Sequence, residues 1–128
     1  MSVPIPVSWG ELIDKVTILE IKMDHIPDPG KLAHVQRELE ALRPLGAQAL
    51  MKQPSLEALV AALKSVNSIL WEVEDQIREC EREKEFGSRF IELARAVYHQ
   101  NDRRAFIKRQ INVLLDSDLI EEKSYSKY

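Results

Sequence analysis

The sequence predicts an all-α protein, an antiparallel helical bundle, and three observations carry that prediction. An unbroken apolar heptad runs from Leu56 to Cys80, with spacings that alternate between three and four residues, as in a helix packed along its length on another helix. Capping and breaking residues recur at spacings that suit helix ends. Beyond Val3-Ile5-Val7, no segment shows the alternation typical of a strand.

The composition indicates a compact protein of one domain, residues 1–128. Of these residues, 45% are hydrophobic and 30% are charged, and the net charge is −3. Basic residues alternate with acidic ones, which argues against nucleic acid as a partner. No apolar run approaches the length of a membrane span, and the first residues lack the features of a signal peptide. Together with a single cysteine, Cys80, on the apolar heptad, these features predict a cytoplasmic protein.

The first part of the chain predicts a short helical hairpin. Ser8-Trp9-Gly10-Glu11 is a capping box, and the helix that it begins reaches about residue 26, before Pro27. Asp28 and Pro29 suit the start of a second helix, which Pro44-Leu45-Gly46 is expected to end. The predicted hairpin therefore comprises residues 8–26 and 29–43, preceded by an extended arm over residues 1–7.

The first of these helices is apolar on two faces, which predicts that both are covered. Its main stripe contains Leu12, Val16, Leu19, Met23 and Ile26, while Ile13, Ile18 and Ile21 point away from it. The second face could be covered by another helix of the same chain or by another subunit. Because the longer helices that follow outreach this hairpin, we predict a homodimer through Ile13, Ile18 and Ile21.

The second part predicts a long hairpin of helices at about 55–85 and 88–116, joined at Phe86-Gly87. The first helix carries the apolar heptad Leu56, Leu59, Leu63, Val66, Leu70, Val73, Ile77 and Cys80. The second has a matching seam with apolar ends and a polar middle: Phe90, Ala94, Val97, Asn101, Arg104, Lys108, Ile111 and Leu115. Gln100-Asn101-Asp102 could instead break this helix. Residues 117–128 form a charged C-terminal tail.

A polar stripe lies beside the heptad, and it is the best candidate for a functional site. It comprises Asn67, Trp71, Glu74 and Arg78, flanked by Asp75. In an antiparallel hairpin, residues equally far from the turn lie at the same height. The polar stretch Asn101, Asp102, Arg104 and Lys108 therefore lies level with the stripe, and we expect Glu74 to meet Arg104.

Two interpretations of these polar residues remain open. They could form an internal network that fixes helix register. Alternatively, they could line a partly open cleft in which Arg78, Arg104 and Lys108 bind an anionic ligand. Trp71 is likewise either a packing residue or a stacking platform for a sugar or base. Asp14 and Glu20 are expected to be solvated or interhelical charges.

No motif fixes a reaction. His25, His34 and His99 lack the spacing of zinc ligands, and the chain has no glycine-rich phosphate loop, nucleophile elbow or Cys–His arrangement. We therefore expect no metal and no cofactor, and the sequence leaves open whether the protein is an enzyme.

Several strings resemble a bacterial family of short all-helical proteins that is classed only as a domain of unknown function. They are Glu11–Lys22, the Asn67-x-x-Leu70-Trp71-x-x-Glu74-Asp75-x-x-Arg78 pattern, Phe90–Tyr98, the Asn101-Asp102-x-Arg104-Ala105-x-x-Lys108 pattern and Glu121–Tyr125. The resemblance implies an occurrence beside or fused to glycosyltransferases and helical-repeat proteins of surface-polysaccharide synthesis.

Two functions follow as expectations. The first is a non-catalytic accessory or interaction module, with a protein partner and a link to bacterial glycan synthesis. The second is a small-ligand-binding protein or enzyme that acts on an anionic or sugar-nucleotide substrate in the polar cleft.

Overall fold

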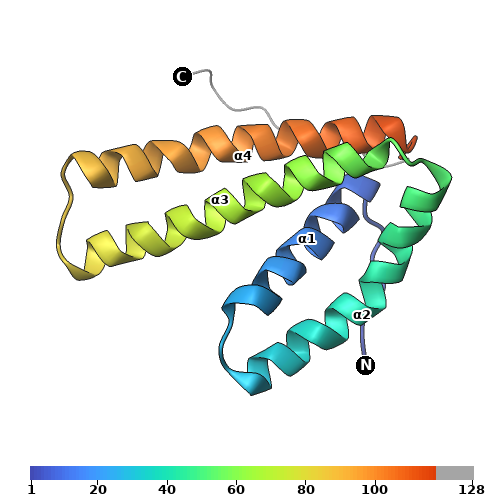
Figure 1. Ribbon diagram of the computed structural model, residues 1–128, viewed down its shortest axis with the longest axis horizontal. Coiled ribbons are helices and arrows are strands. Elements are labelled where there is room, and N and C mark those ends of the chain that lie inside the picture. The colour runs from blue at the N-terminus through green and yellow to red at the C-terminus, as the bar shows by residue number, and fades with distance from the viewer. Residues whose placement is uncertain (118–128) are drawn as a thin grey trace.

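The computed structural model describes residues 1–117, and the all-α prediction is confirmed for them. They form the helices α1 (Trp9–His25), α2 (Pro29–Lys52), α3 (Leu56–Arg82) and α4 (Ser88–Leu114). α3 and α4 make a long antiparallel hairpin. The shorter α1–α2 hairpin is joined to one end of it and projects from that end at an angle (Figure 1). The predicted tail, apart from residue 117, lies outside the described residues. Within residues 1–117, no helix has the length and apolar character needed to cross a membrane.

The first two helices begin as their capping residues predict. Ser8 Oγ accepts the backbone N–H of Glu11 at 3.1 Å, and Asp28 Oδ2 accepts that of Lys31 at 2.9 Å. Each side chain thus satisfies an N–H that has no partner inside the helix. The starts of both helices follow from these local contacts.

The predicted end of the second helix at residue 43 is wrong, because α2 continues through Pro44 to Lys52. An interior proline removes a hydrogen bond and clashes with the preceding turn, at a cost of about 3 kcal/mol. Packing beyond it offsets that cost: Gly46 and Ala49 are both buried, and Ala49 belongs to the central apolar cluster. Tertiary contacts therefore carry the helix past its local stop signal.

The heptad of the third helix and the continuity of the fourth are both confirmed. Leu56, Leu63, Val66 and Cys80 are completely buried in α3, and the heptad positions between them are buried or half-buried. α4 runs through Asn101-Asp102 without a break. Asn101 is a half-buried position of the seam that faces α3, whereas Asp102 is exposed on the helix surface.

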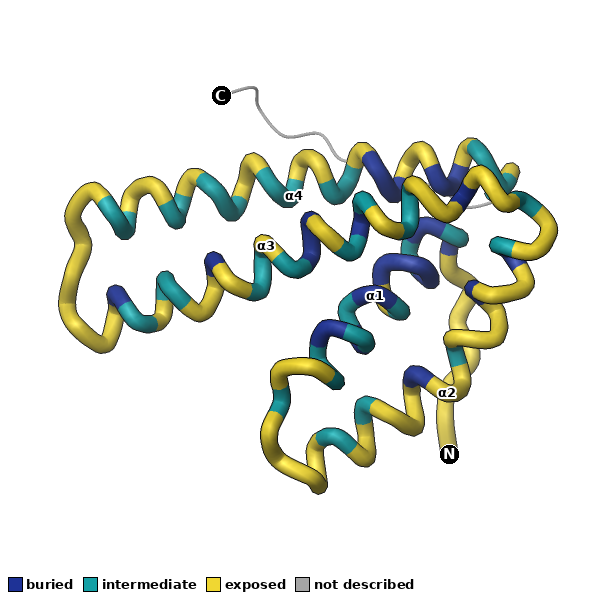
Figure 2. The backbone as a smooth tube through the Cα atoms, in the orientation of Figure 1, coloured by how far each residue is buried: buried dark blue, intermediate teal, exposed yellow. Residues whose placement is uncertain are grey.

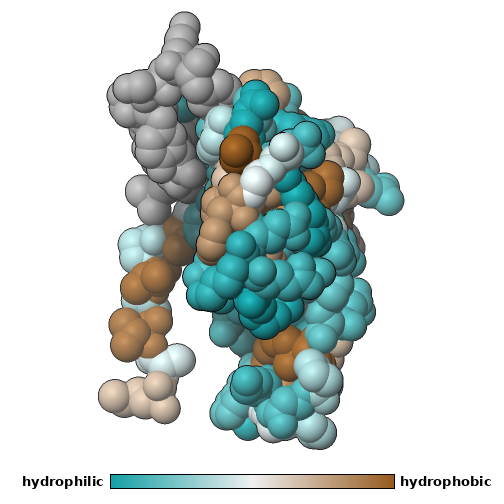
Figure 3. All heavy atoms as spheres, turned by 90° about the vertical axis from the view of Figure 1, so that its left-hand side faces the viewer, coloured by the Kyte–Doolittle hydropathy of each residue, from teal (hydrophilic) through white to brown (hydrophobic). Residues whose placement is uncertain are grey.

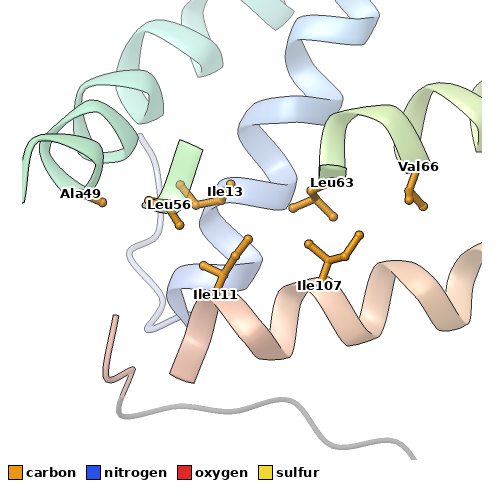
Figure 4. Close-up of a cluster of buried hydrophobic side chains, with 7 residues drawn as sticks. All are labelled: Ile13, Ala49, Leu56, Leu63, Val66, Ile107 and Ile111. Carbon is orange, nitrogen blue, oxygen red and sulfur yellow. The ribbon is translucent and has the colours of Figure 1, made fainter. Parts of the chain in front are cut away.

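The core lies at the end of the long hairpin where α1 joins it. Figure 4 shows Ile13 of α1 among side chains of α3 and α4, with Ala49 of α2 nearby. The cluster comprises Ile13, Ala49, Leu56, Leu63, Val66, Ile107 and Ile111. Buried positions gather at this junction, whereas the far end of the α3–α4 hairpin is largely exposed or half-buried (Figure 2).

The predicted dimer face on the first helix is wrong. Ile13 and Ile21 are only 3% and 2% exposed within the single chain, and Ile18 is half-buried. The alternative cover, helices of the same chain, is the correct one, because α1 lies with α2 on one side and α3 and α4 on the other.

Candidate functional site

A carboxylate of α1 is buried where α1 meets α3 and α4. Asp14 is 1% exposed. Arg104 Nε of α4 donates to Asp14 Oδ1 at 2.9 Å, and a second guanidinium nitrogen donates to Asp14 Oδ2. Paired hydrogen bonds of this kind fix orientation as well as charge. The Asp14–Arg104 pair therefore sets how α1 lies against α4.

The same carboxylate joins α1 to α3. Asn67 Nδ2 donates to Asp14 Oδ1 at 2.9 Å and to Thr17 Oγ1 at 3.0 Å. Thr17 Oγ1 in turn donates to the main-chain oxygen of Asp14 at 2.7 Å. Asn67 and Thr17 are buried, so these bonds are shielded from water and hold three helices in one arrangement.

A second set of polar contacts lies one turn closer to the start of α1. Lys108 Nζ donates to Glu11 Oε2 at 2.7 Å and lies 3.9 Å from Asp14 Oδ2. The backbone N–H of Gly10 donates to Asn112 Oδ1 at 2.6 Å. Among the described residues, every buried side-chain nitrogen or oxygen has a hydrogen-bond partner. The interpretation of an internal network that fixes helix register therefore fits this half of the site.

A cleft of about 480 Å³ opens beside the network, between α1, α3 and α4, a size typical of sites for small ligands. It is lined by Ile18, Ile21, Asn67, Leu70, Trp71, Glu74, Asp75, Arg78 and Arg104. Its apolar surface comes from the two isoleucines, Leu70 and the indole of Trp71. The polar stripe predicted from residue spacing thus lies along one wall of a real cleft.

The indole of Trp71 is held in place by a histidine from α1. The ring centroids of His25 and Trp71 are 5.1 Å apart, and the rings are tilted by 45°. His25 Nδ1 lies 2.8 Å from the carbonyl oxygen of Ile21, which assigns the proton to Nδ1. His25 Nε2 is 3.8 Å from Glu72 Oε1. These contacts limit the rotation of a half-buried aromatic ring at the cleft.

The charges around the cleft are matched nearly one for one. The positive charge of Arg104 is paired with Asp14, and Arg78 Nε lies 3.9 Å from Glu74 Oε2 on the same helix. The expected Glu74–Arg104 ion pair is therefore wrong, since α1 supplies the carboxylate that meets Arg104. With Asp75 added, the cleft has no excess of positive charge.

The structure brings together most of the predicted site residues and separates the others. Lys108 is buried in the network and does not line the cleft. Asn101 is half-buried in α4, and Asp102 is exposed. Asp102 instead lines a second hollow of about 570 Å³ with His99, Arg103 and Phe106. The set predicted as one cluster thus divides into an inner network, a cleft and a separate surface.

Sequence reasoning missed the residues of α1 and the end of α4 that complete the network. Asp14 was expected as an interhelical or solvated charge, and the first of these is correct. Gly10, Asp14, Thr17 and Ile21 follow at intervals of four, three and four residues, which places them on one helix face. Asp14 and Thr17 are thus two polar residues on a face that also carries Ile21, and this pattern could have indicated a buried polar contact. Asn112 had no comparable signal.

The described residues contain no group of three or more histidine, cysteine, aspartate or glutamate side chains that could hold a metal ion. The side chains gathered at the cleft instead offer hydrogen bonds, an aromatic face and charges of both signs.

Fold and site together define an all-α protein of two helical hairpins, with a buried polar network and an adjoining open cleft. A family model described as a family of unknown function, DUF6165, matches residues 1–128, and the chain belongs to that family. Comparison with curated proteins and with solved structures gives no match.

Proposed function

We propose that this protein is a non-catalytic binding module that holds a sugar ring in the cleft between α1, α3 and α4. One observation carries the proposal. The indole of Trp71 lies in a cleft of about 480 Å³ together with carboxylates, guanidinium groups and an amide. A pyranose ring has an apolar C–H face and a rim of hydroxyl groups, so it needs both kinds of surface.

The side chains around Trp71 suit hydroxyl groups. Glu74 and Asp75 are exposed carboxylates that accept hydrogen bonds, and Arg78 offers several donors in a fixed plane. Hydrogen bonds to charged groups contribute more than neutral ones, about 1.5–3 kcal/mol each. Aromatic stacking with a few such bonds is enough to orient one small ring.

The charge balance supports an uncharged sugar over a phosphorylated one. Arg104 is engaged with Asp14, and Arg78 lies beside Glu74. A diphosphate would add two or more negative charges next to Glu74 and Asp75, and like charges disfavour each other at this range. The proposal therefore departs from the expected anionic or sugar-nucleotide ligand.

The buried titratable groups support a binding role without catalysis. Asp14 and Lys108 hold α1 against α4, so a change in their protonation would disturb the packing of helices. The accessory role beside bacterial glycan synthesis, which the resemblance implies, belongs to the same proposal: the module would hold a glycan near an enzyme that a partner supplies.

Tryptophan fluorescence and thermal unfolding test the proposal directly. The purified protein is titrated with neutral monosaccharides and disaccharides, with uridine diphosphate sugars and with pyrophosphate. Neutral sugars should change the Trp71 emission and raise the unfolding temperature, since a ligand at 100 times its Kd stabilises by about 2.7 kcal/mol. The variant Trp71→Ala should lose both responses.

A matched pair of variants separates the cleft from the rest of the surface. Glu74→Gln should weaken sugar binding about tenfold, the effect of losing one charged hydrogen bond. Glu92→Gln, at an exposed position on α4, should leave it unchanged. Binding of uridine diphosphate sugars and pyrophosphate without neutral sugars would favour the anionic alternative. The absence of any Trp71-dependent binding would overturn the proposal of a ligand site.

A further inference from the structure

Asn67 presents a fixed hydrogen-bond acceptor at the cleft. The residue is 5% exposed, and it lines the cleft together with Trp71. Its amide nitrogen is fully used inside the protein, because the two hydrogens are donated to Asp14 Oδ1 and Thr17 Oγ1. Within residues 1–117, no hydrogen bond joins Asn67 Oδ1 to another group. The oxygen is thus the half of the amide that the fold does not use.

The orientation of this amide follows from the chemistry of its two partners. A carboxylate can only accept hydrogen bonds, so Asp14 requires the nitrogen side of the amide. Thr17 Oγ1 has one hydrogen, which it donates to the main-chain oxygen of Asp14 at 2.7 Å. Toward Asn67, Thr17 Oγ1 can therefore only accept. Turning the amide over would place its oxygen against two acceptors, so Nδ2 faces α1 and Oδ1 cannot exchange places with it.

The same oxygen is accessible from the cleft. Among the described residues, every side-chain nitrogen or oxygen that is shielded from solvent has a hydrogen-bond partner. Because Asn67 Oδ1 has none, it is open to solvent, and the cleft is an opening that Asn67 lines. An acceptor in this position favours a ligand group that carries an N–H or O–H donor. It disfavours a group that brings only lone pairs, since two acceptors cannot pair.

Apolar side chains line the cleft together with this acceptor. Ile18, Ile21 and Leu70 are among the lining residues, and Ile18 and Leu70 are half-buried, so they keep surface that a ligand can cover. By contrast, the body of the molecule is mainly hydrophilic on the face that looks out from the α3–α4 turn, where hydrophobic residues form small patches (Figure 3). A ligand that fits both features carries a hydrogen-bond donor next to a small apolar group.

We infer that Asn67 Oδ1 selects an N-acetylated amino sugar, whose amide N–H donates to this oxygen while its methyl group packs on Ile18 and Leu70. The inference rests on the proposed function and narrows the ligand from a neutral sugar ring to one with an acetamido substituent. That substituent joins a donor and a methyl group in one rigid, planar unit. A ring hydroxyl can donate to Asn67 as well, but it offers no apolar surface to the two aliphatic side chains.

Three sugars that differ in one group test this selection without altering the protein. They are the methyl glycosides of N-acetylglucosamine, of 2-O-acetylglucose and of glucose, and the Trp71 fluorescence reports their binding. The ester keeps the carbonyl and methyl groups but replaces the N–H by an oxygen, so it should bind about tenfold more weakly than the amide. Glucose lacks the methyl group and should also bind about tenfold more weakly than the N-acetyl sugar.

Two variants separate the acceptor from the apolar surface. Asn67→Ala should abolish the preference for the amide over the ester, whereas a purely structural role would weaken the binding of all three sugars by one factor. Ile18→Ala should reduce the preference for the N-acetyl sugar over glucose about threefold. Circular dichroism checks that both variants are folded. The Asn67 side-chain carbonyl carbon of the unaltered protein supplies a second measurement, because its NMR resonance should shift with the amide and not with the ester.

The outcomes distinguish this inference from the proposed function. Equal binding of the amide and the ester, with both responses lost in Trp71→Ala, would overturn the role of Asn67 and leave the sugar site standing. An amide-to-ester preference that persists in folded Asn67→Ala would do the same, as would an Asn67 carbonyl resonance that the N-acetyl sugar does not move. The absence of Trp71-dependent binding for every neutral sugar would overturn both proposals.

Discussion

The two ends of the α3–α4 hairpin carry the same apolar heptad but differ in what covers it. At the inner end, α1 enters between the helices, and Leu63 and Val66 have no exposed surface. Toward the outer end, Leu70 and Ile77, the heptad equivalents of Leu63, are only half-buried, although Val73 and Cys80, the equivalents of Val66, stay buried. The difference comes from α1, because α3 and α4 continue past it (Figure 1). A regular seam specifies helix pairing, and a third helix decides how much of the seam is covered.

The ion pairs of the two ends differ in the same way. The Asp14 and Arg104 side chains are 2% and 29% exposed, whereas the Glu74 and Arg78 side chains are 52% and 73% exposed. A pair in water contributes little, since solvent screens it. A pair with one partner buried is costly to break, because the remaining charge loses its compensation. The inner pair should therefore hold the fold, and the outer pair should be available for binding.

The largest expected effect breaks the inner pair. Asp14→Ala should lower the free energy of unfolding by about 3 kcal/mol, because the Arg104 charge and the Asn67 amide lose their acceptor. The matched outer change, Glu74→Ala, should cost less than about 0.5 kcal/mol. Urea unfolding of both variants measures the two values, and equal costs would contradict the distinction between the two ends.

A pair of glycines tests how closely α1 approaches its neighbours. A Cβ at Gly10 would lie 2.5 Å from the carbonyl oxygen of Lys108, whereas one at Gly46 would lie 3.5 Å from Ile13 Cδ1. Gly10→Ala should therefore cost about 2 kcal/mol, since backbone must move. Gly46→Ala should gain up to about 1 kcal/mol from helix propensity. Thermal unfolding measures the sign of the change in stability for each variant. A stabilising Gly10→Ala would show that the α1–α4 contact is loose.

The smallest effect compares the turns that end the two long helices. Lys84 after α3 and Asp116 after α4 both have positive φ, at 57° and 51°. Left-handed backbone is strained for lysine and tolerated better by aspartate. Lys84→Gly should therefore stabilise the protein by about 1 kcal/mol, and Asp116→Gly by less. Differential scanning calorimetry can compare the two shifts, and a larger gain at Asp116 would reverse the expected order.

Periodicity and capping residues predicted most of the fold because they act locally. Ser8 and Asp28 cap helices whose apolar spacing already marks their extent. Pro44 shows where local reasoning fails, because burial of Gly46 and Ala49 outweighs the lost hydrogen bond. The same limit applies to Ile13 and Ile21. A second apolar face indicates that something covers it, and only the tertiary arrangement identifies α2, α3 and α4 as the cover.

The cleft was predicted more completely than the network. Asn67, Trp71, Glu74, Asp75 and Arg78 share one side of one helix, so spacing alone groups them. The partner of Arg104 could not be found this way. Loop symmetry relates α3 to α4, and it carries no information on how α1 enters between them. The carboxylate that pairs with Arg104 is therefore that of Asp14, whereas counting residues from the α3–α4 turn had predicted Glu74.

The polar network also bears on the order of folding. Asp14 contacts residues that lie 53 and 90 positions further along the chain, while α3 and α4 are joined by a short turn. Closing long loops costs more chain entropy than closing short ones, and local contacts form faster. We infer that the α3–α4 hairpin forms first and that α1 docks late. Substitutions at Asp14 should then speed unfolding and leave the folding rate almost unchanged. The contacts of this carboxylate would thus form after the main folding barrier and would slow the opening of the folded protein.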